Sequence, residues 1–101
     1  LVFMAYNVNL PEKALTDIKT LAEKCDLEKV ILFGSRARGD NRAKSDIDLA
    51  VSGGKTDEFR CLADEEVYTL LMFDIVDLDG PVQLELMRSI EREGVVIYEK
   101  V

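Results

Sequence analysis

A chain of 101 residues, 48% of them hydrophobic and 33% charged, is long enough to form one domain with a single core, spanning residues 1–101. Its net charge of −7 argues against direct binding to nucleic acid, because contacts to a phosphate backbone require clustered Lys and Arg. The chain has no histidine, which excludes Ser-His-Asp and Cys-His catalysis and most zinc sites. Catalysis would therefore depend on carboxylates, hydroxyls, Arg, Lys, Tyr or a bound metal ion.

The N-terminus and the two cysteines indicate the compartment. No apolar run is long enough to span a membrane, and residues 1–10 lack the basic flank and cleavage site of a signal peptide. Because Leu1 is an unusual first residue, we interpret this segment as partly disordered or a start-site remnant, with Met4 a candidate start. Cys25 and Cys61 are too far apart for a metal knuckle or a redox pair. We expect both to be small buried residues in a reducing compartment, which favours a cytoplasmic location.

The first half of the chain predicts one helix and two strands. Apolar residues at helical spacing predict a helix over residues 11–25, and a β-rich run predicts a strand over 29–33. Gly34 and Ser35 end this strand and open a helical or turn segment. Alternation with a period of two then predicts a second strand over 46–51.

The second half continues the alternation. A helix is expected over residues 57–69 with Thr56 as its N-cap, followed by a strand over 71–76. A helix over 81–93 and a strand over 95–98 complete the chain. The order predicts an α/β (α+β) domain, in which helices pack on a small mixed β-sheet of about four strands.

Two aspartates interrupt the second predicted strand. Side chains alternate along a strand, so Asp46 and Asp48 share one face. Carboxylates this close repel each other, and they either titrate upward together or are neutralised by a cation. Mg²⁺ fits best, because it takes oxygen ligands and binds through one or two carboxylates together with substrate phosphates.

The third predicted strand adds another carboxylate. Asp74 lies centrally between Phe73 and Ile75, where an unpaired buried charge would be costly, whereas Asp77 lies at the end of the run in a turn or cap position. Three carboxylates on adjacent strands could hold two metal ions about 4 Å apart for in-line phosphoryl or nucleotidyl transfer. The alternative is that these aspartates are edge-strand charges facing solvent.

The glycine turn before the aspartates predicts an anion site. Gly34 and Ser35 would present backbone N–H groups and a hydroxyl to a phosphate, with Arg36 and Arg38 close behind them. An ordinary Gly-Ser loop is the alternative. We exclude a Walker A loop at Gly54-Lys55-Thr56, because the pattern requires glycine where this chain has a strand leucine.

The sequence FGSRARG at residues 33–39, followed by SDIDLA at residues 45–50, resembles the signature of the DNA polymerase β nucleotidyltransferase superfamily. More narrowly, the chain resembles the minimal nucleotidyltransferase domains of prokaryotes over nearly its whole length. The resemblance implies a polymerase β-type nucleotidyltransferase fold. It also implies transfer of AMP from ATP to a hydroxyl, with two Mg²⁺ ions and release of pyrophosphate.

The same resemblance assigns roles to individual residues. Asp46, Asp48 and Asp74 match the catalytic and metal-binding carboxylates, and the third of them acts on the incoming hydroxyl. The positions that match nucleotide-binding residues are Gly34, Ser35, Arg36 and Arg38.

Minimal members of the family are commonly encoded beside a HEPN-domain toxin, and they act as antitoxins that adenylylate one of its tyrosines. At 101 residues, the acceptor surface would have to come largely from such a partner. Two alternatives remain. The chain could be a catalytically silent antitoxin that acts by occlusion, or a small-molecule nucleotidyltransferase that modifies an antibiotic.

Overall fold

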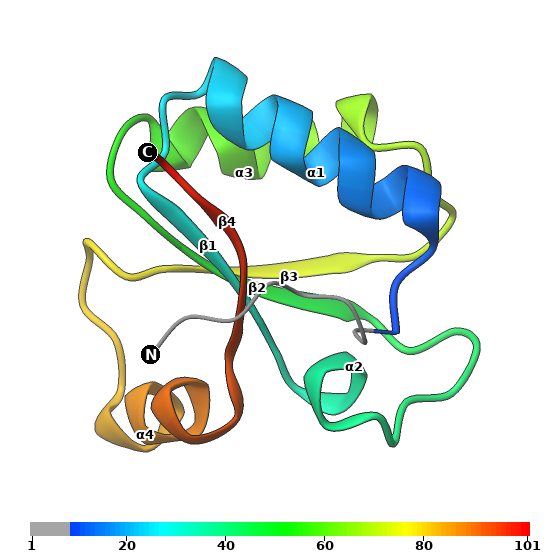
Figure 1. Ribbon diagram of the computed structural model, residues 1–101. Coiled ribbons are helices and arrows are strands. Elements are labelled where there is room, and N and C mark those ends of the chain that lie inside the picture. Colours follow the sequence, from blue (N-terminus) through cyan, green and yellow to red (C-terminus); the bar gives the residue numbers. More distant parts are fainter. Residues whose placement is uncertain (1–8) are drawn as a thin grey trace.

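The computed structural model describes residues 9–101, which form a four-stranded sheet covered by helices on both faces (Figure 1). Helices α1 and α3 lie on one face, and α2 and α4 lie on the other. The elements follow in the order α1 (Glu12–Lys24), β1 (Lys29–Phe33), α2 (Ser35–Arg38), β2 (Ile47–Ser52), α3 (Thr56–Glu66), β3 (Phe73–Asp77), α4 (Leu84–Glu93) and β4 (Val95–Glu99).

The α/β architecture with a four-stranded mixed sheet is confirmed. The strand order is β3-β2-β1-β4, with β1 antiparallel to both β2 and β4 and with β2 parallel to β3. A parallel pair requires a crossover connection, which α3 supplies over the face that α1 also covers. The two strands predicted to bring the aspartates together are therefore neighbours.

The larger core fills the space between the sheet and the pair α1 and α3. Ile18, Leu32, Leu49 and Phe59 are completely buried there. Burying a side chain of this size stabilises the fold by about 1.5–3 kcal/mol, so this layer supplies most of the rigidity on which the site depends. A smaller cluster of Phe33, Ala50 and Ile90 packs under α4 on the other face.

Helix α3 ends three residues earlier than the sequence predicts. Val67 has an extended backbone (φ −92°, ψ 123°) and is 4% exposed, so its side chain packs into the core although the helix has ended. The N–H of Tyr68 then donates to the carboxylate of Asp17 on α1, at 2.9 Å. Residues 67–69 are weak helix formers, so this contact with α1 is enough to end the helix before them.

Helix α4 also differs, because it begins at Leu84 and not at Pro81. Gln83 before it has an extended backbone (φ −62°, ψ 142°).

Strand β3 lies one to two residues later than expected, over Phe73–Asp77. Asp77 takes the expected turn role, accepting hydrogen bonds from the Thr56 hydroxyl and the N–H of Asp79, both at 2.9 Å.

The prediction for the cysteines is half wrong. Cys25 is buried and free, as expected, but Cys61 is exposed and free. The helical phase of α3 explains the difference, because Phe59 and Ala63 face the core and the position between them faces away from it. The interpretation of residues 1–10 as partly disordered or a start-site remnant stays a prediction, because residues 1–8 lie outside the described residues. Within residues 9–101, no helix is both long and apolar enough to cross a membrane.

Candidate active site

The predicted aspartates meet where β2 and β3 run side by side. Asp48 and Asp74 are paired in the parallel register of these strands, so their side chains lie on the same face of the sheet. Asp46 lies one residue before β2 and shares that face by alternation. The fold therefore brings three carboxylates from two segments to one end of the parallel pair.

The three carboxylates differ in their exposure. Asp48 is half-buried, whereas Asp46 and Asp74 are exposed. The expectation that Asp74 lies in a buried strand is wrong, because β3 is an edge strand of the sheet. Asp74 is therefore open to solvent and to an approaching molecule, and the feature that distinguishes it is its position opposite Asp48.

The half-buried Asp48 has a perturbed acidity. Its pKa is raised from the ordinary 3.8 to about 6. Burial is the largest cause, because it disfavours the charged form, and the negative charges of Asp74 and then Asp46 add to it. Arg38 lowers the pKa and Glu93 raises it, by smaller amounts. The carboxylates thus repel one another in the free protein.

Gly34 lets the turn after β1 approach Asp48 closely. Its φ of 77° lies in the left-handed region that favours glycine. A Cβ atom at this position would overlap Oδ2 of Asp48. Ser35 directly follows as the first residue of α2. The sequence-predicted phosphate turn and the central carboxylate therefore lie against each other, and only glycine allows this contact.

Arg36 is placed differently from what a nucleotide-binding residue would require. Its side chain is buried, with only 4% of the residue exposed. The guanidinium donates to four main-chain carbonyls, those of Asn9 (2.6 Å), Ser45 (3.0 Å), Ala43 (3.1 Å) and Arg42 (3.5 Å). Three of these carbonyls belong to the loop that leads into Asp46. The contacts of Arg36 therefore hold that loop, and its guanidinium points into the domain.

Arg38 lies at the surface beside the carboxylates. It donates to Asp40 at 3.1 Å and to Glu93 at 2.9 Å, and these hydrogen bonds raise its pKa. Glu93 is a residue of the site that the sequence did not indicate, because it lies at the end of α4 far from either motif. Among the predicted arginines, Arg38 is the one whose guanidinium lies at the surface near Asp48, where a phosphate could reach it.

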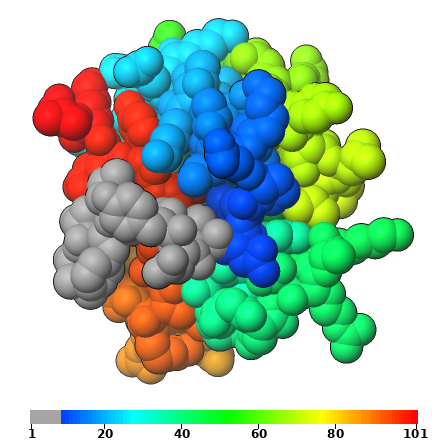
Figure 2. All heavy atoms as spheres, turned by 45° about the vertical axis from the view of Figure 1, so that its right-hand side comes forward, coloured from blue at the N-terminus to red at the C-terminus, as the bar shows by residue number. Residues whose placement is uncertain are grey.

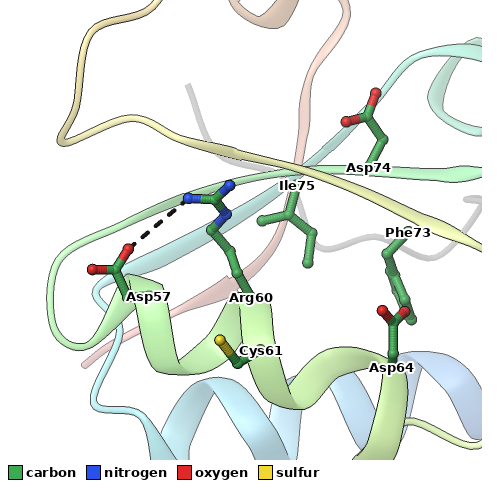
Figure 3. Close-up of a pocket in the computed structure, with 7 residues that line it drawn as sticks. All are labelled: Asp57, Arg60, Cys61, Asp64, Phe73, Asp74 and Ile75. Atoms are coloured by element: carbon green, nitrogen blue, oxygen red, sulfur yellow. Dashed lines mark ion pairs between the residues drawn. The ribbon is translucent and has the colours of Figure 1, made fainter.

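A cavity of about 570 Å³ lies between β3 and α3, and Phe73, Asp74 and Ile75 of β3 line it (Figure 3). Phe73 and Ile75 point from β3 toward α3, whereas Asp74 between them points away. Helix α3 lines the opposite wall with Asp57, Arg60, Cys61 and Asp64. The edge strand therefore brings Asp74 to the border of a groove with both polar and apolar walls.

The donor set suits a hard divalent cation in its chemistry. All three side chains offer carboxylate oxygens, which Mg²⁺ prefers, and a cation between them would relieve the repulsion that raises the pKa of Asp48. As the side chains stand within residues 9–101, no group of three or more His, Cys, Asp or Glu residues is arranged to hold a metal ion. Metal binding by Asp46, Asp48 and Asp74 thus stays a prediction.

A family model described as polymerase beta, nucleotidyltransferase matches residues 16–101. The matched range contains the glycine turn, all three aspartates and every strand of the sheet. The chain belongs to the polymerase beta nucleotidyltransferase family. No curated protein matches the sequence at a significant level.

Solved structures share this family's fold with the chain. A toxin–antitoxin complex with AMP-PNP matches with a TM-score of 0.64 and 22% identity, over 85% of this chain and 73% of that one. A tyrosine-to-alanine mutant of the toxin–antitoxin MntA-HpeT matches with a TM-score of 0.64 and 25% identity, over 91% of this chain and 75% of that one. A double aspartate-to-glutamate mutant of MntA-HpeT matches with a TM-score of 0.63 and 20% identity, over 85% of this chain and 73% of that one. The polymerase β-type fold expected from the sequence is confirmed.

Replacing Arg36 should destabilise this nucleotidyltransferase domain. In Arg36→Met, four main-chain carbonyls lose the buried guanidinium that they share as a donor, and we expect a loss of about 2–4 kcal/mol in the free energy of unfolding. The matched control is Arg42→Met, which changes an exposed side chain and should cost less than about 0.5 kcal/mol. Denaturant unfolding measures both, and equal stability of the two variants would contradict the assigned role.

Replacing Asp48 should have the opposite effect on stability in metal-free buffer. Because its pKa is about 6 in the folded protein and 3.8 ordinarily, the folded state binds the proton more tightly than the unfolded state. The ionised carboxylate thus lowers stability above pH 6, and this cost fades as the pH falls toward 3.8. We expect Asp48→Asn to raise the Tm by a few degrees at pH 8 and to approach wild type at pH 4.5.

The control for this measurement is Asp64→Asn, which changes an exposed carboxylate of α3. Its Tm should follow that of the wild type at both pH values when measured with EDTA present. A Tm for Asp48→Asn below wild type at pH 8 would show that the carboxylate makes a stabilising contact in the free protein.

Proposed function

We propose that this chain is a Mg²⁺-dependent nucleotidyltransferase that transfers AMP from ATP to a hydroxyl of a partner protein. The partner is a HEPN-domain toxin, the acceptor is one of its tyrosines, and the chain acts as the antitoxin. The observation that carries the proposal is the meeting of three carboxylates beside a glycine turn, with Asp48 paired to Asp74 across two strands and lying against Gly34.

The nucleotide would bind between the turn and the carboxylates. Gly34 and Ser35 begin the short helix α2 next to Asp48, so the triphosphate would lie between this turn and the aspartates. Asp46 and Asp48 would hold Mg²⁺, which when bound neutralises the phosphate charge and orients the α-phosphorus. Arg38, whose exposed guanidinium is already near Asp48, would pair with a phosphate oxygen.

The acceptor would approach from the side of β3. Asp74 is exposed on the edge strand, so a hydroxyl from a second molecule can reach its carboxylate. In the step, the hydroxyl oxygen bonds to the α-phosphorus, the bond from that phosphorus to the bridging oxygen breaks, and pyrophosphate leaves. The hydroxyl proton passes to Asp74. The remaining contribution is positioning and charge neutralisation, which this chemistry mainly requires.

The similar structures support the choice of nucleotide and partner. One is a toxin–antitoxin complex with AMP-PNP, an analogue of ATP. In another, two aspartates two positions apart were replaced by glutamate, the same spacing as Asp46 and Asp48 here. A third, at 25% identity, carries a tyrosine-to-alanine replacement. The adenine nucleotide and the Asp-X-Asp pair are two components that the proposed reaction uses.

The test is adenylylation of the purified toxin encoded by the neighbouring gene, with ATP and Mg²⁺, followed by intact-mass spectrometry. We expect the toxin to gain the mass of one or more AMP units. The double variant Asp46→Asn, Asp48→Asn should lower the rate by roughly 100-fold or more, because the metal supplies several kcal/mol of charge stabilisation. EDTA should abolish transfer by the wild type.

The control Glu12→Gln, Glu23→Gln removes two exposed carboxylates of α1 and should retain the wild-type rate. Undiminished transfer by the aspartate variant, or none by the wild type, would refute the proposed reaction. If the aspartate variant cannot transfer AMP but still protects cells from the toxin, the antitoxin acts by occlusion. Transfer to an aminoglycoside in place of the toxin would identify a small-molecule enzyme.

A further inference from the structure

An exposed apolar segment leads from α3 into β3. Tyr68 is 76% exposed, Leu70 is 103% exposed and Met72 is 67% exposed, so three large side chains within five residues face solvent. Figure 2 shows this part of the chain, in yellow-green, at the surface beside α1 in blue. Contiguous apolar groups at a surface indicate an interaction site more often than isolated ones do.

Two cavities extend this segment on either side. One cavity, of about 540 Å³, is lined by residues 65–70 and so includes the first part of the segment. The groove between α3 and β3 begins where the segment ends, with Phe73 and Ile75 on its wall. Because β3 is an edge strand, its outer backbone groups are also available to another chain. Apolar side chains, concave surface and an unpaired strand edge thus form one continuous face.

The border of this face is acidic. Asp64, Glu65 and Asp74 are exposed around it, and within residues 9–101 they form no ion pair. The cations at this border are already paired, since Lys24 contacts Glu66 at 3.1 Å and Arg60 contacts Asp57 at 3.9 Å. The border therefore favours a molecule with positive charges around an apolar centre.

We infer that the segment Tyr68–Met72 and the edge strand β3 form the docking surface for the acceptor protein, which covers them with an apolar patch bordered by Lys and Arg. This inference rests on the proposed function. It follows from the position of Asp74, which lies two residues after Met72 on the same chain segment, so a protein seated on this face brings its hydroxyl to that carboxylate.

The test measures binding without ATP, so that it does not depend on catalysis. The probe is the purified toxin from the neighbouring gene, and the variant is Tyr68→Ser, Leu70→Ser, Met72→Ser. We expect the Kd by calorimetry to rise roughly 100-fold or more, because buried aromatic and apolar anchors carry most of the affinity of an interface. The Tm should stay at the wild-type value, because these side chains are exposed.

The matched control is Leu84→Ser, which changes a 64% exposed leucine on α4, at the other face of the sheet. It should bind the toxin as the wild type does. The variant Asp46→Asn, Asp48→Asn should also bind normally, so that a loss of transfer alone leaves the docking result unaffected.

A charge-reversed variant, Asp64→Lys, Glu65→Lys, tests the acidic border. We expect a roughly tenfold lower association rate at low salt and a weaker dependence of that rate on salt.

Unchanged toxin binding by the triple serine variant would overturn the inference and leave the proposed reaction standing. Absence of any binding by the wild type would overturn it as well. If the wild type is a dimer in sedimentation and the triple variant is a monomer, a second copy of this chain occupies the face and not the acceptor protein.

Discussion

The parallel pairing of β2 with β3 is the constraint on which the candidate site depends. It sets Asp48 opposite Asp74, although 26 positions and a complete crossover helix separate them along the chain. The pairing in turn depends on α3, which packs its apolar face on the sheet beside α1 and returns the chain in the same direction. A shift of the register by one residue would move Asp74 to the opposite face of the sheet, away from Asp48.

The crowding of charge at Asp48 is therefore a property of the fold and not of a local motif. Burial and two neighbouring carboxylates raise its pKa to about 6, which makes the free protein less stable than it would be with a neutral residue. A site that stores such repulsion is typical of functional positions, because a bound cation or ligand relieves it. The close approach of Gly34 adds a geometric reason, since the turn leaves no space for a side chain between itself and this carboxylate.

Arg36 shows how a residue within a motif can support the site without facing the substrate. A guanidinium has five donors in a fixed plane, and here they satisfy carbonyls from the N-terminal segment and from the loop before β2. The loop between α2 and β2 has no regular secondary structure of its own. Its carbonyls would otherwise lack partners inside the domain, so the buried arginine fixes the direction from which Asp46 enters the sheet.

The local pattern of residues was sufficient to predict the elements, the alternation that puts Asp46 and Asp48 on one face, and the glycine turn before them. These features follow from periodicity and backbone preference, which act over a few residues. The edge position of β3, the exposure of Asp74 and Cys61, the early end of α3 and the contact of Glu93 with Arg38 were decided by tertiary structure. The physical reason is that each depends on which elements become neighbours, and residues distant in sequence are selected for contact only when the whole core packs.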